Sequence, residues 1–248
     1  MFRAELLKLK RSSAWLIALI LPLLAVTTGT ANFMNNQEMF QRDWTTLASQ
    51  ITLFYGLLFF SMGVGVLAAT VWRMEHRGTN GNLLLTTTRR PLELVLAKIA
   101  VIAVPVAFMQ VVLVAGVFVS GTVVVGLDGA MPADVVLAGA LTVIAALPLI
   151  AFQSLLSMLL RSFAAPVAIC LFGCVAGVAT VTSVPLRPLS HVLPQGINTR
   201  TINLGSNAVA GSGGVTLADA APLLLPALAL AAALAAVTLL AIRAVKLR

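Results

Sequence analysis

The side chains that most often carry chemistry are few in this chain and lie far apart. The only histidines are His76 and His191. The only cysteines, Cys170 and Cys174, fall within one apolar run, where thiols are usually packing residues rather than metal ligands or a disulfide. The Gly-Ser-Gly sequence at 211–213 lacks the strand–turn–helix context and the base of a nucleophile site. There is also no Gly-x-x-x-x-Gly-Lys-Ser/Thr phosphate loop and no His-Glu-x-x-His zinc motif. We therefore expect no catalytic residue, metal or cofactor on this chain.

Two other patterns within the apolar runs have a possible function. Polar side chains that could line a substrate path, or simply bond between helices, are Gln110, Gln153, Ser154 and Ser157. Gly173 and Gly177 form a Gly-x-x-x-Gly pattern, in which small residues one turn apart let helix backbones approach closely. This pattern predicts helix packing within the chain or an interface between subunits.

The composition indicates what kind of element holds these residues. The chain has 248 residues, of which 60% are hydrophobic and 10% charged, and its mean hydropathy is +1.03. Soluble domains are nearer 45–50% apolar and about 25% charged. A water-soluble globule of this size could not bury so much apolar surface. A soluble enzyme, a disordered chain and a disulfide scaffold are therefore excluded, and a polytopic membrane protein remains.

Charged residues divide the chain into six long apolar stretches, each able to cross about 30 Å of hydrocarbon as a helix of roughly 20 residues. The stretches do not alternate polar and apolar residues as the strands of a membrane β-barrel would. The first could also be a cleaved signal peptide, but its apolar part is long and we expect a retained span. We predict an all-α polytopic membrane protein with a single transmembrane domain, 1–248, whose spans are 14–30, 51–72, 96–122, 135–159, 166–184 and 222–242.

The basic residues predict the orientation of these spans. With the N-terminus inside, thirteen of the sixteen Lys and Arg residues lie on the inner side, as the positive-inside rule requires. Both termini are then cytoplasmic. The formal charge of +8 reflects topology and attraction to anionic lipid, and it does not indicate nucleic-acid binding. Residues 1–13 mix charges with leucines, which predicts either an interfacial amphipathic helix or a solvated flank of the first span.

Two connections are unusually long. The inner loop 73–95 contains the apolar triplet Leu83–Leu85, which suggests a short helix that docks on another protein. The outer loop 185–219 is proline-rich and glycine-rich, and it either dips back into the membrane as broken helices or forms an exposed loop.

The inner loop resembles a known signature. Glu75-His-Arg-Gly-Thr, Leu84-Leu85-Thr86, Arg89-Arg90-Pro and Leu96-Ala-Lys98 are similar to the pattern of ABC-2 type transporter permeases. The nearest branch is the one that provides self-protection (immunity) against bacitracin and lantibiotics. The resemblance extends over essentially the whole chain, since it includes the basic start, the six spans and the long last outer loop.

The resemblance implies a set of partners in the bacterial cytoplasmic membrane. Such a permease pairs with a second permease, identical or homologous, and with two ATPase subunits that hold ATP and Mg. The inner loop forms the coupling helix that inserts into the ATPase, and the outer loop forms short re-entrant helices. By position, the coupling residues here are Glu75, Arg77, Gly78, Thr79, Leu83, Leu84, Leu85 and Thr86.

The function that follows is a permease subunit, not an enzyme, of an ATP-driven exporter. The branch implies outward movement of an amphipathic antibiotic or antimicrobial peptide, and hence antibiotic resistance. The low aromatic content of 6% disfavours a glycan substrate, which would need aromatic side chains to stack on sugars. The alternatives are a non-transporting scaffold or sensor subunit and, less favoured, an intramembrane enzyme.

Overall fold

The computed structural model describes residues 2–10, 12–76, 90–206 and 217–246, and every regular element in these ranges is a helix. The α-helices are α1 (Phe2–Lys10), α2 (Ala14–Asn35), α3 (Trp44–Phe54), α4 (Phe60–Arg73), α6 (Pro91–Val119), α7 (Ala133–Ala145), α8 (Leu147–Leu159), α9 (Ala164–Thr182), α10 (Pro194–Ile202) and α11 (Leu217–Lys246). Two π-helical turns, η1 (Tyr55–Phe59) and η2 (Ser120–Val125), and one 3₁₀ helix, η3 (Val184–His191), complete them.

Six helical stretches are long and apolar enough to cross a membrane, which confirms the all-α polytopic fold. They are Ala14–Asn35, Trp44–Arg73, Pro91–Val125, Ala133–Leu159, Ala164–Thr182 and Asp219–Ala244. Several begin or end outside the predicted limits. The second begins at Trp44 rather than Ile51 because the Asp43 carboxylate accepts the backbone N–H of Thr46 at 2.6 Å and caps the helix.

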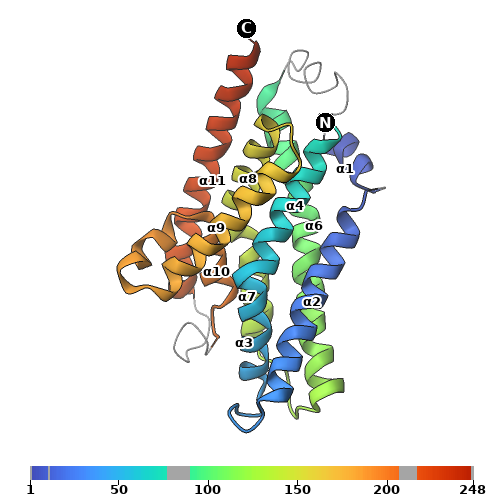
Figure 1. Cartoon of the computed structure of the whole chain (residues 1–248), viewed down its shortest axis with the longest axis vertical. Coiled ribbons are helices and arrows are strands. Elements are labelled where there is room, and N and C mark those ends of the chain that lie inside the picture. The colour runs from blue at the N-terminus through green and yellow to red at the C-terminus, as the bar shows by residue number, and fades with distance from the viewer. Residues whose placement is uncertain (1, 11, 77–89, 207–216, 247–248) are drawn as a thin grey trace.

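The spans stand side by side as one bundle (Figure 1). The helix α1 and the last turns of α11 lie at one end of this bundle, and the α2–α3 and α6–α7 connections lie at the other. We call these the inner and outer ends, following the orientation that the basic residues predict. The main core lies where α2, α3, α4 and α6 meet, and it includes Phe33, Ile51, Phe60 and Met109.

Two interruptions shape the spans. Residue Ala146 leaves the helical pattern between α7 and α8, two residues before Pro148, whose ring and missing N–H disrupt a helix interior. The π turn at Tyr55–Phe59 interrupts the second span. Its Gly56 carbonyl accepts a hydrogen bond from Thr199 Oγ1 of α10 at 3.0 Å.

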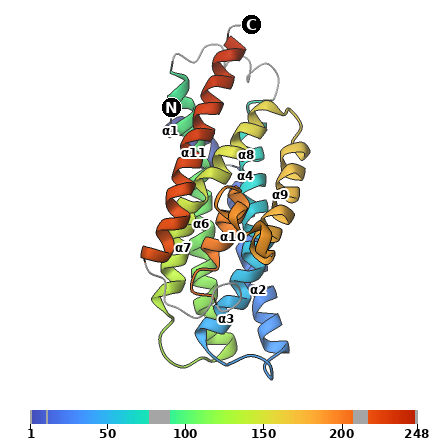
Figure 2. The same ribbon diagram turned by 90° about the vertical axis from the view of Figure 1, so that its left-hand side faces the viewer.

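The connection between the last two spans is built into the bundle. Seven of the nine residues of α10 are buried, and the helix packs against α9, α7 and α11 (Figure 2). The 194–202 part of the predicted outer loop is therefore a buried short helix rather than an exposed loop.

Candidate coupling site at the inner end of the bundle

Four charged side chains gather at the inner end, where α1, α4 and α6 meet. They are Glu5, Lys8, Glu75 and Lys98, and we refer to them as the inner ion cluster. Lys98 lies two turns into α6, and its side chain is 0% exposed. Glu75 follows the last residue of α4, and only 5% of it is exposed. A buried charge is costly unless it is paired, and here two ammonium groups face two carboxylates.

The geometry of the inner ion cluster joins three separate parts of the chain. Lys98 Nζ donates to Glu5 Oε2 at 2.6 Å and to Glu75 Oε1 at 2.8 Å. Lys8 Nζ, whose side chain is 40% exposed, donates to Glu5 Oε1 at 2.9 Å and to Glu75 Oε1 at 2.8 Å. The N-terminal helix, the end of the second span and the start of the third are therefore fastened together by four charge-assisted hydrogen bonds.

The surroundings of Glu75 and Lys8 favour the ionised forms of these two side chains. Burial alone would raise the pKa of Glu75, but the neighbouring Lys98 and Lys8 outweigh burial and lower the pKa below its usual 4.5. Burial alone would lower the pKa of Lys8, but the hydrogen bonds that Lys8 donates to Glu75 and Glu5 raise the pKa above 10.5. Both shifts show that the pairing is stronger than the loss of hydration.

Further contacts connect the residues around the inner ion cluster to α8. The Trp72 ring lies 5.1 Å from Lys98 Nζ, within the range of a cation–π contact. Its Nε1 donates to Ser154 Oγ at 2.8 Å. One turn further, His76 Nε2 lies 2.6 Å from the Ser157 carbonyl oxygen. Four helices are thus joined around the point where the chain enters the 77–89 segment.

The predicted coupling residues fall partly outside the described residues. Arg77, Gly78, Thr79, Leu83, Leu84, Leu85 and Thr86 all lie in the range 77–89, which the structure does not describe. Glu75 is described, and its carboxylate is turned into the inner ion cluster instead of being presented to a partner. Glu75 can therefore act on coupling only indirectly, by holding in place the helices on either side of the segment.

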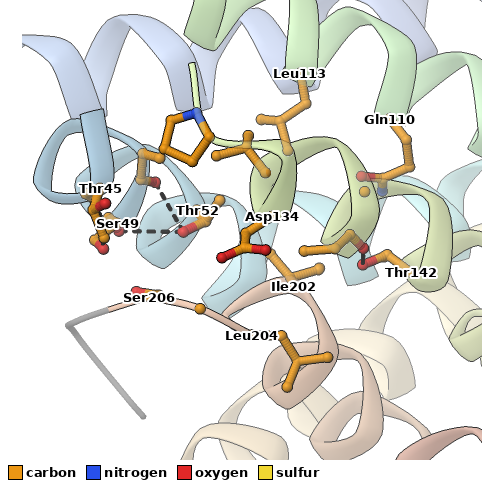
Figure 3. A pocket seen from close by; sticks show the side chains of 16 residues that line it. Thr45, Ser49, Thr52, Gln110, Leu113, Asp134, Thr142, Ile202, Leu204 and Ser206 are labelled. Carbon is orange, nitrogen blue, oxygen red and sulfur yellow. Dashed lines mark hydrogen bonds between the residues drawn. The ribbon is translucent and has the colours of Figure 1, made fainter. Parts of the chain in front are cut away.

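Two of the four polar residues of the predicted substrate path line different cavities of the described part of the chain, Gln110 at the outer half of the bundle and Ser157 at the inner end. Ser154 and Ser157 are buried on the inner half of α8 beside α4. Gln153 is fully buried, and neither side-chain polar atom has a hydrogen-bond partner among the described residues. Gln110 lines a cavity between α3, α6, α7 and the chain that follows α10 (Figure 3).

The Gly-x-x-x-Gly pattern of α9 faces α10 of the same chain. A side chain at Gly173 would meet the amide of Gln195. A Cβ at Gly177 would lie 2.8 Å from Gln195 Cβ and 3.1 Å from the Gln195 backbone carbon. The two glycines therefore let a buried short helix approach the fifth span closely.

The sequence analysis missed the inner ion cluster, although a signal for it exists. Lys98 stands within an otherwise apolar helical stretch, and such a residue normally has a partner. In the predicted topology the acidic residues on the same side of the membrane are Glu5, Glu75 and Glu93, and two of these three are its partners. The positive-inside pattern treats Lys98 as one of the inner basic residues and gives no partner for it.

The six spans define a multi-pass membrane protein. A comparison with known families identifies its class more closely. Residues 1–177 match the family described as ABC-2 family transporter protein. This match extends over most of the chain, so the chain belongs to the ABC-2 transporter family. No curated protein and no solved structure matches it.

Membership of this family defines the class of function. The chain is a permease subunit of an ABC transporter, not the catalytic subunit, and it is a multi-pass protein of the bacterial cytoplasmic membrane. Permeases of this family associate with an ABC ATPase.

Proposed function

We propose that this permease exports an amphipathic antibiotic or antimicrobial peptide and that the inner ion cluster transmits the motion of the ATPase to the spans. Two ATPase copies, holding ATP and Mg, and a second permease, identical or homologous, complete the transporter. The resemblance of the inner loop to the immunity branch supports the choice of substrate, together with the low aromatic content.

The observation that carries the coupling proposal is the position of the inner ion cluster. Glu75 lies two residues before the 77–89 segment, and Lys98 lies on the helix that follows the segment. Their ion pair at 2.8 Å fastens the two ends of the segment to each other. Glu5 and Lys8 add the N-terminal helix to the same unit.

This arrangement favours rigid-body transmission. A force applied to the segment between α4 and α6 moves both helices and α1 together, because their inner ends are joined by buried ionic hydrogen bonds. Closure of an ATP-bound ATPase pair then biases the spans between two arrangements. The nucleotide shifts this equilibrium only by its differential affinity for the two states.

The proposal is tested in the assembled transporter. The permease is produced with its ATPase, purified as a complex and placed in sealed vesicles, where ATP hydrolysis and movement of a fluorescent cationic amphipathic peptide are measured together. We expect Glu75→Gln, which keeps the side-chain shape but removes the charge, to lower transport per ATP hydrolysed by about tenfold, a loss equivalent to one charged hydrogen bond. Lys98→Met is expected to lower it further.

The matched control is Glu93→Gln. Glu93 also lies near the start of α6 and also pairs with a basic residue, Arg90 at 2.7 Å, but its side chain is 52% exposed. This variant should transport like the wild type. Unchanged transport per ATP in a folded Glu75→Gln complex would overturn the coupling role. A wild-type complex that holds its ATPase but moves no peptide would favour a scaffold or sensor subunit instead.

A further inference from the structure

A cavity of about 220 Å³ lies in the outer half of the bundle (Figure 3). Its walls come from α3, α6, the start of α7 and the chain just after α10. The lining combines apolar residues with hydroxyl, amide and carboxylate groups. The polar residues that matter for binding are Thr52, Gln110, Asp134 and Thr142.

Two of the hydroxyl groups that line this cavity, those of Thr52 and Thr142, can act only as acceptors for an occupant. Thr52 Oγ1 donates its proton to the Ala48 carbonyl oxygen at 2.9 Å. Thr142 Oγ1 donates its proton to the Ala138 carbonyl oxygen at 2.7 Å. A hydroxyl has one proton and two lone pairs, so these groups offer only lone pairs to an occupant.

Gln110 adds a buried acceptor. Only 4% of this residue is exposed, and its Nε2 donates to the Tyr55 hydroxyl at 3.2 Å. Its Oε1 is buried and has no hydrogen-bond partner among the described residues. A buried amide oxygen normally has a donor, and an occupant of the cavity would supply one.

Asp134 gives the cavity its charge. It is the one ionisable side chain in the described lining, and Figure 3 shows its carboxylate pointing into the space between α3 and the chain after α10. A carboxylate in the same cavity as the acceptors of Thr52, Thr142 and Gln110 favours a positively charged donor. The opposite chemistry, an anion or a group rich in acceptors, would be repelled.

We propose that this cavity binds a protonated alkylamine group of the transported molecule. An alkylammonium has three donors and no acceptor, which complements the lining. The volume equals about seven waters at roughly 30 Å³ each, enough for one amine-bearing side chain but not for a whole peptide. The binding site does not depend on the mechanism of coupling. That its occupant is part of the transported molecule rests on the proposed function.

Calorimetric titration of the wild-type permease in lipid nanodiscs tests the binding. The probe is 1,5-diaminopentane, and 1,5-pentanediol serves as an uncharged molecule of the same length. We expect saturable binding of the diamine and none of the diol. Asp134→Asn should weaken diamine binding by at least about tenfold, the loss expected for a charged hydrogen bond. Gln110→Leu should weaken it by a smaller factor.

The control variant is Asp128→Asn, which removes an exposed carboxylate of the α6–α7 connection that does not line the cavity. It should bind the diamine like the wild type. Equal weakening in Asp128→Asn and Asp134→Asn, equal binding of the diol, or displacement of the diamine by millimolar sodium would each overturn the proposal. No ATPase is present in this measurement, so its failure would leave the coupling role of the inner ion cluster intact.

Discussion

Lys98 brings a positive charge into the first turns of a spanning helix, and its surroundings are built to compensate that charge. Glu5 and Glu75 both accept hydrogen bonds from it, and the Trp72 ring lies beside it. A buried ion pair adds little stability compared with apolar residues of the same shape, but removing one partner leaves an uncompensated charge. The inner ion cluster should therefore respond strongly to single substitutions.

The first prediction concerns stability. Lys98→Met leaves two buried carboxylates with the partly exposed Lys8 as their one remaining partner in the inner ion cluster, and it should lower the free energy of unfolding by about 3–5 kcal/mol. Solvent screens the exposed pair of Arg90 and Glu93, so Glu93→Gln should be close to neutral. Unfolding by sodium dodecyl sulfate from mixed micelles measures both. Equal destabilisation by the two substitutions would show that the cluster is not a buried ionic unit.

The second prediction concerns pH. Because Lys98 and Lys8 outweigh burial and lower the pKa of Glu75 below 4.5, its ionised form stabilises the folded state above that pH. This stability is lost as the pH falls through the lowered pKa. The difference in unfolding free energy between wild type and Glu75→Gln should therefore be largest near neutral pH and shrink in acid. A difference that grows as the pH falls would contradict this assignment.

Among the elements, α10 packs closely against α9 at two glycines, Gly173 and Gly177, which differ in what surrounds them. At Gly173 an added methyl would meet only the end of the Gln195 side chain, which can rotate away. At Gly177 it would meet Gln195 Cβ and the backbone of Gln195 and Gly196. Backbone cannot move aside without shifting the helix.

The third prediction follows from this difference. Gly177→Ala should destabilise the protein by about 1–3 kcal/mol, the usual cost of overpacking, and Gly173→Ala should cost less. Thermal unfolding of the two purified variants in detergent gives the order directly. If Gly173→Ala is the more damaging substitution, α10 does not occupy the position described.

The elements differ in how far the sequence could predict them. The six spans follow from long apolar stretches, because a lipid environment requires internally bonded helices. Their ends were less accessible, since the start of the second span at Trp44 depends on the local hydrogen bond that Asp43 accepts. The Gly-x-x-x-Gly pattern predicted close packing, but nothing in the sequence of α9 identifies Gln195 as its partner.

At the scale of the whole molecule, the two ends of the bundle carry different chemistry. The inner end holds a buried cluster whose four charges balance, and the outer half holds an acidic cavity. The positive-inside pattern predicted the orientation but neither site. Both sites join residues far apart in the chain, such as Glu5 and Lys98, and such pairs emerge only when the helices are packed.

The contact between the inner segment and the ATPase is tested most directly by a cross-link between the permease and its ATPase in native membranes. Single cysteines are introduced, in a background with Cys170 and Cys174 replaced by alanine, at Asn82 in the 77–89 segment and at Glu38 in the α2–α3 connection. A short photoactivatable cross-linker attached to each is then illuminated. We predict an ATPase adduct from Asn82→Cys and none from Glu38→Cys. The claim that the inner segment contacts the motor would be contradicted if Asn82→Cys gave no adduct while the complex remained assembled, or if a membrane-impermeant thiol reagent labelled it from outside intact cells.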